Sequence, residues 1–424
     1  MKEETEKIHL ISKLKEDRQP SKGRQLIVLM ACMYMHFMSL GFTVSLGVIY
    51  VELIRYFDTQ RSLAALVQSM YQGLTNLGGL FFAGTIHSHG VGKATILASV
   101  SGAVSLFMSS FSVNIYMVII LIGLFGGLAM SVNYLSAFIA VGWAFTKHRR
   151  TALALLTMAT AVGQTALPNI VELIISEYGW SGAIIIASGL VLNSLPCGLI
   201  LYSSESYFTR HKHVGETEKL PFCTCQSRVD VAFTLFMVVC AVFPGTGAVE
   251  SWFIVDLTDL RGYGRQAGTV LLSLVGLFGL IGRMGGTLLL KIRPSTRAAI
   301  PLGVSFAFFA LGHFTVIYFV KYSTMLAGVI FRGISVGFIM CIQPGMLLEL
   351  KGIDRFPKAV ALSNFLSGSV QIACGYMGGY IADLTGGYEI AFYIATVVAV
   401  GCSACLFIIQ ALLYRVTQTI GVAP

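Results

Sequence analysis

Charged residues are scarce in this chain. Of its 424 residues, 12% are Asp, Glu, Lys or Arg and 55% are hydrophobic, whereas soluble domains carry about 25% charged residues. The few charges cluster in short runs between long apolar stretches. Backbone polar groups cannot stay unpaired in hydrocarbon, so apolar stretches near twenty residues long predict transmembrane helices. The composition therefore excludes a soluble globular protein.

The sequence also lacks the recognised motifs of enzyme active sites. The sequence has no Gly-rich phosphate loop followed by Lys-Ser/Thr, no metal-ligand cluster with a recognised spacing and no nucleophile motif. Its nine cysteines lie mostly within apolar stretches and imply no disulfide framework. We therefore predict that the protein is not an enzyme and has no catalytic residue, cofactor or metal site. Without a nucleotide site, primary active pumping is not expected either.

Twelve apolar stretches match the length of a membrane span. Stretches 26–51 and 62–92 contain no charged residue, and 94–146 fits two spans divided by the small and polar residues 109–114. Each remaining stretch is near the roughly 20 residues that cross a ~30 Å hydrocarbon core. These stretches are 151–171, 179–202, 231–249, 266–290, 298–320, 323–348, 359–382 and 390–414. The sequence predicts an all-α polytopic membrane protein with twelve transmembrane helices.

Lys and Arg are unevenly divided between the connecting loops. An N-terminus in the cytoplasm places 22 of the 29 Lys and Arg residues inside and 5 outside, which satisfies the positive-inside rule. The topology also explains the net charge of +9 without nucleic acid as a partner. Segment 1–24 lacks the short apolar core of a signal peptide. We expect 1–24 and 415–424 to be cytoplasmic tails.

The spans fall into two sets of six. A polar segment, 203–230, separates an N-terminal six-helix half, 25–202, from a C-terminal half, 231–414, and is the predicted cytoplasmic central loop. Gly-Gly at 78–79 in the second span has a counterpart at 285–286 in the eighth, each followed by an apolar run and a basic loop. Two parallel six-helix repeats around a central cavity are the layout of the major facilitator fold. We predict that fold, with two pseudo-symmetric halves.

Four segments carry a family resemblance. They are Ser45-Leu-Gly-Val-Ile-Tyr-Val-Glu, Trp143-Ala-Phe-Thr-Lys-His-Arg-Arg-Thr-Ala-Leu-Ala, Gly333-Ile-Ser-Val-Gly through Pro344, and Gly378-Gly-Tyr-Ile-Ala-Asp-Leu-Thr-Gly-Gly-Tyr. With these motifs, residues 41–414 resemble the monocarboxylate transporter family of the major facilitators, which includes lactate, pyruvate, thyroid-hormone, creatine and carnitine carriers. The resemblance implies a small organic anion or zwitterion as substrate. It also implies a plasma-membrane location and, as for some members, a single-span ancillary glycoprotein.

The chain departs from this family at three places. The acidic-Gly-Gly-Trp signature that opens the first span in much of the family is absent. Proton-coupled lactate carriers have a Lys later in that span and, in the eighth span, an Asp one turn before an Arg. In this chain Val48 stands at the position of that Lys and Gly279 at the position of that Asp, whereas the Arg is present as Arg283. Because the sequence also shows no acidic residue near a membrane midplane, facilitated diffusion is slightly favoured over proton symport.

Two arginines fall inside predicted spans. Arg283 lies about two thirds of the way across the eighth, and Arg332 roughly a third to halfway down the tenth. An intramembrane cation costs about 3 kcal/mol on insertion scales and faces a cavity or a partner. A guanidinium can bind a carboxylate through two N–H groups. We predict that Arg283 binds a substrate carboxylate, with pairing to a helix carbonyl or polar neighbour as the alternative. Arg332 either helps to bind an anion or extends towards the membrane surface.

Three other polar residues are candidate substrate ligands. His36 titrates in a range that suits proton transfer, although a neutral, packed histidine is the more frequent case. Asn133 and Asn364 lie in the fourth and eleventh spans, which commonly line the cavity of this fold. Their amides can bind substrate hydroxyl or carbonyl groups, or hold helices together.

Charged clusters at the span ends are candidate gates. Lys147, Arg149 and Arg150 at the mouth of the fifth span either anchor the chain at the cytoplasmic surface or pair with Asp354 when the inner side closes. On the outer side, acidic residues are candidates to pair with Arg261 or Arg265. These are Glu250, Asp256 and Asp259.

Together these features predict a secondary transporter. It would carry a monocarboxylate or a related carboxylate-bearing anion or zwitterion across a lipid bilayer by alternating access. The alternative is a non-transporting membrane receptor or scaffold that retains the carrier fold. A channel is less favoured, because two six-helix halves with charged ends suit alternating access better than an open pore.

Overall fold

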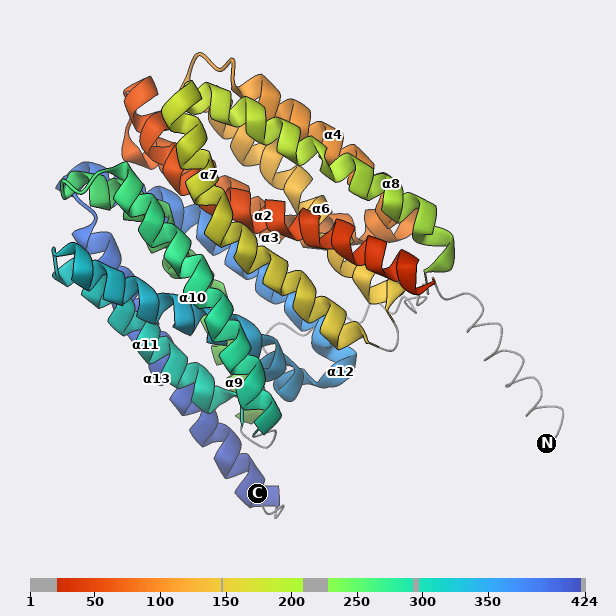
Figure 1. The fold of residues 1–424 in the computed structure, drawn as a ribbon. Coiled ribbons are helices and arrows are strands. Elements are labelled where there is room, and N and C mark those ends of the chain that lie inside the picture. The colour runs from red at the N-terminus through yellow and green to blue at the C-terminus, as the bar shows by residue number, and fades with distance from the viewer. Residues whose placement is uncertain (1–20, 146–147, 209–227, 293–296, 421–424) are drawn as a thin grey trace.

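The structure is a bundle of long α-helices (Figure 1). The computed structural model describes residues 21–145, 148–208, 228–292 and 297–420, and no strand occurs among them. The elements are α2 (Lys22–Phe57), α3 (Arg61–His89), α4 (Val91–Ser109), α5 (Ile115–Val118), the π-helix η1 (Ile119–Gly126), α6 (Gly127–Ala144), α7 (Arg149–Leu192), α8 (Ser194–Ser204), the 3₁₀ helix η2 (Glu205–Tyr207), α9 (Arg228–Leu260), α10 (Arg265–Ile292), α11 (Ala299–Tyr318), α12 (Tyr322–Thr385) and α13 (Glu389–Ile420). The predicted all-α fold is confirmed.

Two of the long helices are broken at a glycine. Gly179 in α7 has φ 68°, and Gly352 in α12 has φ 70°. Side chains clash in this region of φ, so glycine is the residue that adopts it readily. Within the described ranges, nine helical stretches are long and apolar enough to cross a membrane. Separating the segments at the two breaks and counting α3 gives one helical segment for each of the twelve predicted spans. That each of them crosses the membrane stays a prediction.

The helices form two groups. In the N-terminal half (22–207), α2 packs on α7, and α4 packs on α6 and α8. In the C-terminal half (228–420), α11 and α9 each pack on α12 and α13. Figure 1 shows the red-to-yellow half above the green-to-blue half. The predicted central loop lies mostly outside the described residues, and its boundaries stay a prediction.

Two pairs of helices, α3 with α12 and α7 with α10, make most of the contacts between the halves. A Cβ on Gly73 would lie 2.7 Å from the carbonyl oxygen of Gly368, and one on Gly276 would lie 2.8 Å from the backbone nitrogen of Thr165. Glycine therefore lets the backbones approach, as small residues do between membrane helices. We call the end where α2 passes to α3 and α9 to α10 the distal end. The proximal end is the opposite one, where α2 starts and α13 ends (Figure 1).

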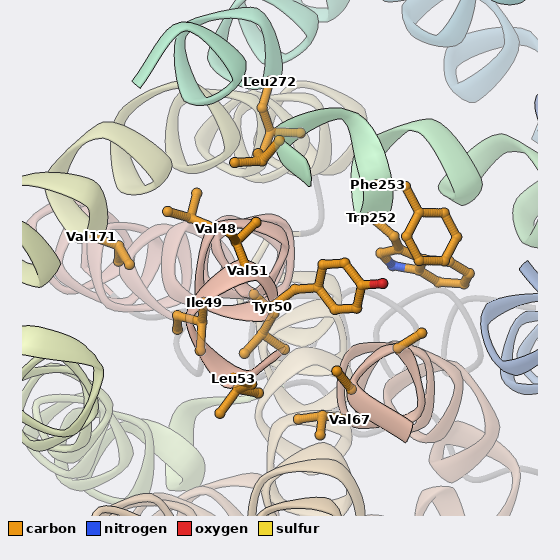
Figure 2. Packing of buried hydrophobic residues seen from close by; sticks show 14 of the residues in the cluster. Val48, Ile49, Tyr50, Val51, Leu53, Val67, Val171, Trp252, Phe253 and Leu272 are labelled. Atoms are coloured by element: carbon orange, nitrogen blue, oxygen red, sulfur yellow. The ribbon is translucent and has the colours of Figure 1, made fainter. Parts of the chain in front are cut away.

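An apolar core lies towards the distal end, where the halves meet. It includes Val48 and Tyr50 of α2, Val67 of α3, and Trp252 and Phe253 of α9. Figure 2 shows the Tyr50 ring directed from α2 towards Trp252 and Phe253, and the Tyr50 and Phe253 ring centres are 5.5 Å apart. The two halves are therefore packed against each other at this end.

Candidate functional site

Arg283 reaches from the C-terminal half into the N-terminal half. Its Nη1 donates a hydrogen bond to the carbonyl oxygen of Thr157 on α7. Its Nε is buried and has no hydrogen-bond partner, and no acidic side chain among the described residues interacts with it. A Cβ on Gly337 would lie 2.7 Å from the Arg283 backbone nitrogen, so glycine is required where α12 passes α10. The guanidinium thus keeps its charge uncompensated between the halves.

His36 lies beside this guanidinium. Its Nδ1 is 3.3 Å from Oγ1 of Thr160, one turn along α7 from the carbonyl that Arg283 binds. The centre of the His36 ring is 4.6 Å from the centres of both the Tyr134 and the Phe138 rings on α6. Arg283 is close enough to interact electrostatically with both His36 and Tyr134. The structure therefore brings together two of the predicted substrate ligands, His36 and Arg283.

The two asparagines lie in different surroundings. Asn133 on α6 is 1% exposed, and neither atom of its amide has a hydrogen-bond partner. It directly precedes Tyr134, which contacts His36. Asn364 on α12 is exposed and lies one turn to the proximal side of Gly368. No described contact places Asn364 with Arg283, and a binding role for either residue stays a prediction.

Arg332 is already neutralised inside the C-terminal half. Its Nε is 3.2 Å from Oε2 of Glu250, and its Nη2 donates to the Gly247 carbonyl at 2.6 Å and to the Ser251 hydroxyl at 2.8 Å. Nδ1 of His313 lies 3.6 Å from the same carboxylate oxygen. Glu250 and His313 are 0% exposed and Arg332 is 2% exposed. Buried charges of this kind are tolerated when they are paired.

The Glu250–Arg332 pair corrects two expectations from the sequence. Glu250 was expected to pair with Arg261 or Arg265 at the outer surface, and Arg332 was expected to have no acidic neighbour. Both are wrong because α9 continues as a helix to Leu260, which places Glu250 inside the bundle, facing α12. Arg261 instead donates to the carbonyl oxygens of Val316 and Ile317 at the end of α11, at 2.8 Å each.

Most of the predicted inner gate lies outside the residues that the structure describes. Lys147 and the side chains of Arg150 and Asp354 lie outside the described residues. Arg149 is exposed, with its guanidinium against the backbone of Gly142. The gating role of all four residues stays a prediction.

The distal end is held together by ion pairs between the halves. Arg55 of α2 contacts Asp259 at 2.5 Å, and Nε of Arg61 lies 2.9 Å from Asp256. Arg265 contacts both Glu52 and Glu172. Asp256 and Asp259 therefore form ion pairs at this end, and Arg265 does as well, although with partners other than those expected.

A second distal contact joins the halves through helix capping. The Asp383 carboxylate on α12 accepts hydrogen bonds from the backbone N–H groups of Arg61 and Ser62, at 2.8 and 2.9 Å. These N–H groups belong to the first turn of α3, where backbone donors have no intrahelical partner and a negative charge is favourable. The Tyr388 hydroxyl donates to Asp256 at 2.5 Å and lies 2.9 Å from the Tyr50 hydroxyl. One half thus caps a helix of the other.

A polar stripe on α3 was missed by the sequence analysis. Trp252 Nε1 donates to Gln72 at 3.0 Å, Gln68 donates to the Trp252 carbonyl at 3.4 Å, and Asn76 donates to Gln371 at 2.7 Å. The i, i+4, i+8 spacing of Gln68, Gln72 and Asn76 places all three on one helix face. That spacing was visible in the sequence and marks the surface by which α3 meets the C-terminal half.

A cavity of about 480 Å³ lies away from these groups. It is bounded by α3, α4, η1 and α6 and is almost wholly apolar, with exposed side chains such as Leu97 and Phe125 at its rim. The hydroxyl of Ser105 in its wall already donates to the Leu121 carbonyl. Its lining includes no charged side chain, so the cavity offers no counter-charge to an ionised solute.

A family model for the Major Facilitator Superfamily matches residues 27–372. The chain belongs to this superfamily. Its proteins are transporters and not enzymes, and the predicted fold class is confirmed. The division of the helices into two groups agrees with this assignment.

Curated relatives include monocarboxylate transporters. Mouse monocarboxylate transporter 6 is 24% identical over 394 residues, which cover 87% of this chain and 83% of the relative. Chicken monocarboxylate transporter 4 is 24% identical over 389 residues, covering 89% and 81%. Human monocarboxylate transporter 14 is 28% identical over 179 residues, covering 42% and 35%. The resemblance seen in the four sequence segments is confirmed.

Solved structures share the fold at low identity. A POT family transporter in complex with 5-aminolevulinic acid matches with a TM-score of 0.76 at 11% identity, covering 92% of this chain and 98% of the other. A peptide transporter of the same family in complex with alafosfalin matches with a TM-score of 0.74 at 12% identity, covering 91% and 95%. At this identity the likeness concerns the fold.

Proposed function

We propose that the protein is a secondary transporter of small carboxylate-bearing anions or zwitterions, of the monocarboxylate class, and that it works by alternating access. The observation that carries this proposal is Arg283. Its cation lies between the halves without an acidic partner among the described residues, and an anionic substrate would compensate it. The curated relatives named monocarboxylate transporters support the substrate class.

The distal contacts support the transport mechanism. Ion pairs and a helix cap join the halves at the distal end. The contacts between α7 and α10 extend from Arg265 and Glu172 at the distal end to Arg283 and Thr157. We propose that the halves separate and close at opposite ends in alternation, with the distal contacts broken when that end opens.

We further propose that the distal end faces outward and that both termini are cytoplasmic. The excess of Lys and Arg on the other side supports this orientation. The plasma membrane is the proposed location, and the need for a single-span ancillary glycoprotein stays a prediction from the family resemblance. Facilitated diffusion was favoured because no acidic residue was expected near the midplane. Glu250, fully buried beside Arg332, removes that reason, so coupling to protons is a question for experiment.

Uptake measurements test the proposal. Cells expressing wild type, Arg283→Gln or Arg283→Lys are supplied with radiolabelled lactate, pyruvate, creatine, carnitine or aromatic amino acids at external pH 6 and 7.5. We expect saturable uptake of at least one solute by wild type and its loss in Arg283→Gln. Arg283→Lys should retain part of the uptake, because it keeps the positive charge but lacks the paired N–H groups with which a guanidinium binds a carboxylate. Faster uptake at pH 6 would indicate proton symport, and equal rates facilitated diffusion. Correctly placed wild-type protein with no uptake of any solute would instead favour the receptor or scaffold.

A further inference from the structure

Part of the Arg283 guanidinium remains without a hydrogen-bond acceptor. Nε of Arg283 is buried and has no hydrogen-bond partner among the described residues, whereas the His36 ring lies against the main chain of Tyr134 as well as the Thr160 hydroxyl. Tyr134 contacts the rings of His36 and Phe138 and interacts electrostatically with Arg283. The Tyr134 hydroxyl forms no hydrogen bond with another described residue. The Arg283 guanidinium therefore keeps an unused donor near Tyr134, and no acidic side chain of the described residues interacts with it.

The position of these groups follows from α7. Arg283 binds the carbonyl of Thr157, and His36 lies 3.3 Å from the hydroxyl of Thr160. Residues three apart lie on the same face of a helix. The side chains of α2 and α10 therefore meet over a single turn of α7, and Tyr134 of α6 joins them through its ring, whose centre is 4.6 Å from that of His36. Helices α2 and α6 belong to the N-terminal half, and α10 belongs to the C-terminal half.

A carboxylate has the chemistry to complete this arrangement. The Thr157 carbonyl occupies only Nη1 of Arg283, while a guanidinium carries five N–H donors. One carboxylate oxygen can accept from the remaining donors of Arg283, and the other can accept from a phenolic hydroxyl. Hydrogen bonds to an ionised acceptor are shorter and stronger than those between neutral groups. A neutral solute would leave the cation uncompensated.

We propose that Tyr134 is a second substrate ligand, whose hydroxyl on the N-terminal half binds the same carboxylate that Arg283 binds from the C-terminal half. This inference rests on the proposed transport function and adds a residue to its site. A substrate held from both sides links the halves directly. Among the described residues, the hydrogen bond that Arg283 itself donates to the N-terminal half goes to a main-chain carbonyl.

A matched pair of hydroxyl deletions tests this role. Tyr134→Phe removes the proposed ligand and keeps the ring that packs on His36. Tyr34→Phe removes a hydroxyl that donates to the Leu190 carbonyl at 2.7 Å, inside the N-terminal half. Initial uptake rates of radiolabelled lactate, pyruvate, creatine, carnitine and aromatic amino acids give KM for each variant. The thermal stability of each purified protein is measured with and without the same solutes.

We expect Tyr134→Phe to raise KM about tenfold or more, as for the loss of a hydrogen bond to a charged group. The same variant should need a correspondingly higher solute concentration for thermal stabilisation. Tyr34→Phe should lower the melting temperature and leave KM unchanged. An unchanged KM in Tyr134→Phe, with uptake abolished in Arg283→Gln, would overturn the role of Tyr134 and leave the proposed function standing. A wild-type protein that neither transports nor is stabilised by any of these solutes would overturn both.

Discussion

Arg283 and Arg332 are chemically identical and lie in helices of the same half, yet their surroundings are opposite. Arg332 has the Glu250 carboxylate at 3.2 Å and two further oxygen acceptors. Arg283 has a main-chain carbonyl from the other half and no acidic partner among the described residues. We infer from this comparison that Arg283, whose charge is left uncompensated, serves the substrate, and that Arg332, which is paired, serves the scaffold.

Removing the counter-charge of Arg332 should have the largest effect on stability. Glu250→Gln leaves the Arg332 cation buried without a counter-charge, and losing one partner of a buried pair costs about 3–5 kcal/mol. We expect a large fall in melting temperature and in expression. Replacing both partners, as in Glu250→Gln with Arg332→Met, should recover much of the loss, because apolar groups replace buried pairs well.

The control is Asp259→Asn on the same helix, whose carboxylate pairs with the exposed Arg55. It should change the melting temperature little. A Glu250→Gln protein as stable as the Asp259→Asn protein would show that the Glu250–Arg332 pair contributes nothing to the scaffold, and the contrast between the two arginines would fail.

The helix cap at the distal end should show an intermediate effect. Asp383→Asn removes a carboxylate that accepts from two backbone N–H groups of α3, and helix caps contribute about 1 kcal/mol. Because this cap crosses between the halves, its loss should favour opening of the distal end by about fivefold. Ser69→Cys, at a position where α3 meets Gly375, reports opening through its labelling by a membrane-impermeant thiol reagent.

Asp58→Asn is the matched control for the cap, since Asp58 is exposed at the same end and Asn also tolerates its left-handed backbone. Labelling should rise in Asp383→Asn and stay at the wild-type rate in Asp58→Asn. Equal labelling in all three backgrounds would contradict a role for Asp383 in holding the distal end shut.

The smallest effect is expected from Arg55→Gln. The Arg55 side chain is 52% exposed, although its contact with Asp259 is short. Exposed ion pairs contribute about 0–1 kcal/mol, and the middle of that range corresponds to a change of about two- to threefold in the labelling rate of Ser69→Cys. A change as large as that of Asp383→Asn would mean that the exposed pairs, rather than the cap, hold the distal end.

Hydropathy was sufficient to predict the helices and to find Arg283. Long uncharged stretches specify spans, and a cation within one is visible in the sequence alone. The pairing of Arg332 could not be predicted, because Glu250 lies 82 positions away and follows an apolar stretch, where it looked like the end of a span. Tyr134 gave no signal, since tyrosine is common in membrane helices and its importance depends on a neighbour in the other half.

The most direct test of the contrast is a side-by-side measurement of Arg283→Gln and Arg332→Gln, in which the uptake rate per surface-exposed molecule and the melting temperature are determined for both. Our account predicts that Arg283→Gln loses uptake at least a hundredfold while its melting temperature stays at or above the wild-type value, because an uncompensated cation is removed. It predicts that Arg332→Gln loses stability, because Glu250 is left buried and unpaired. Normal uptake in Arg283→Gln, or a stable Arg332→Gln protein with uptake abolished, would contradict the assignment of Arg283 to the substrate and Arg332 to the scaffold.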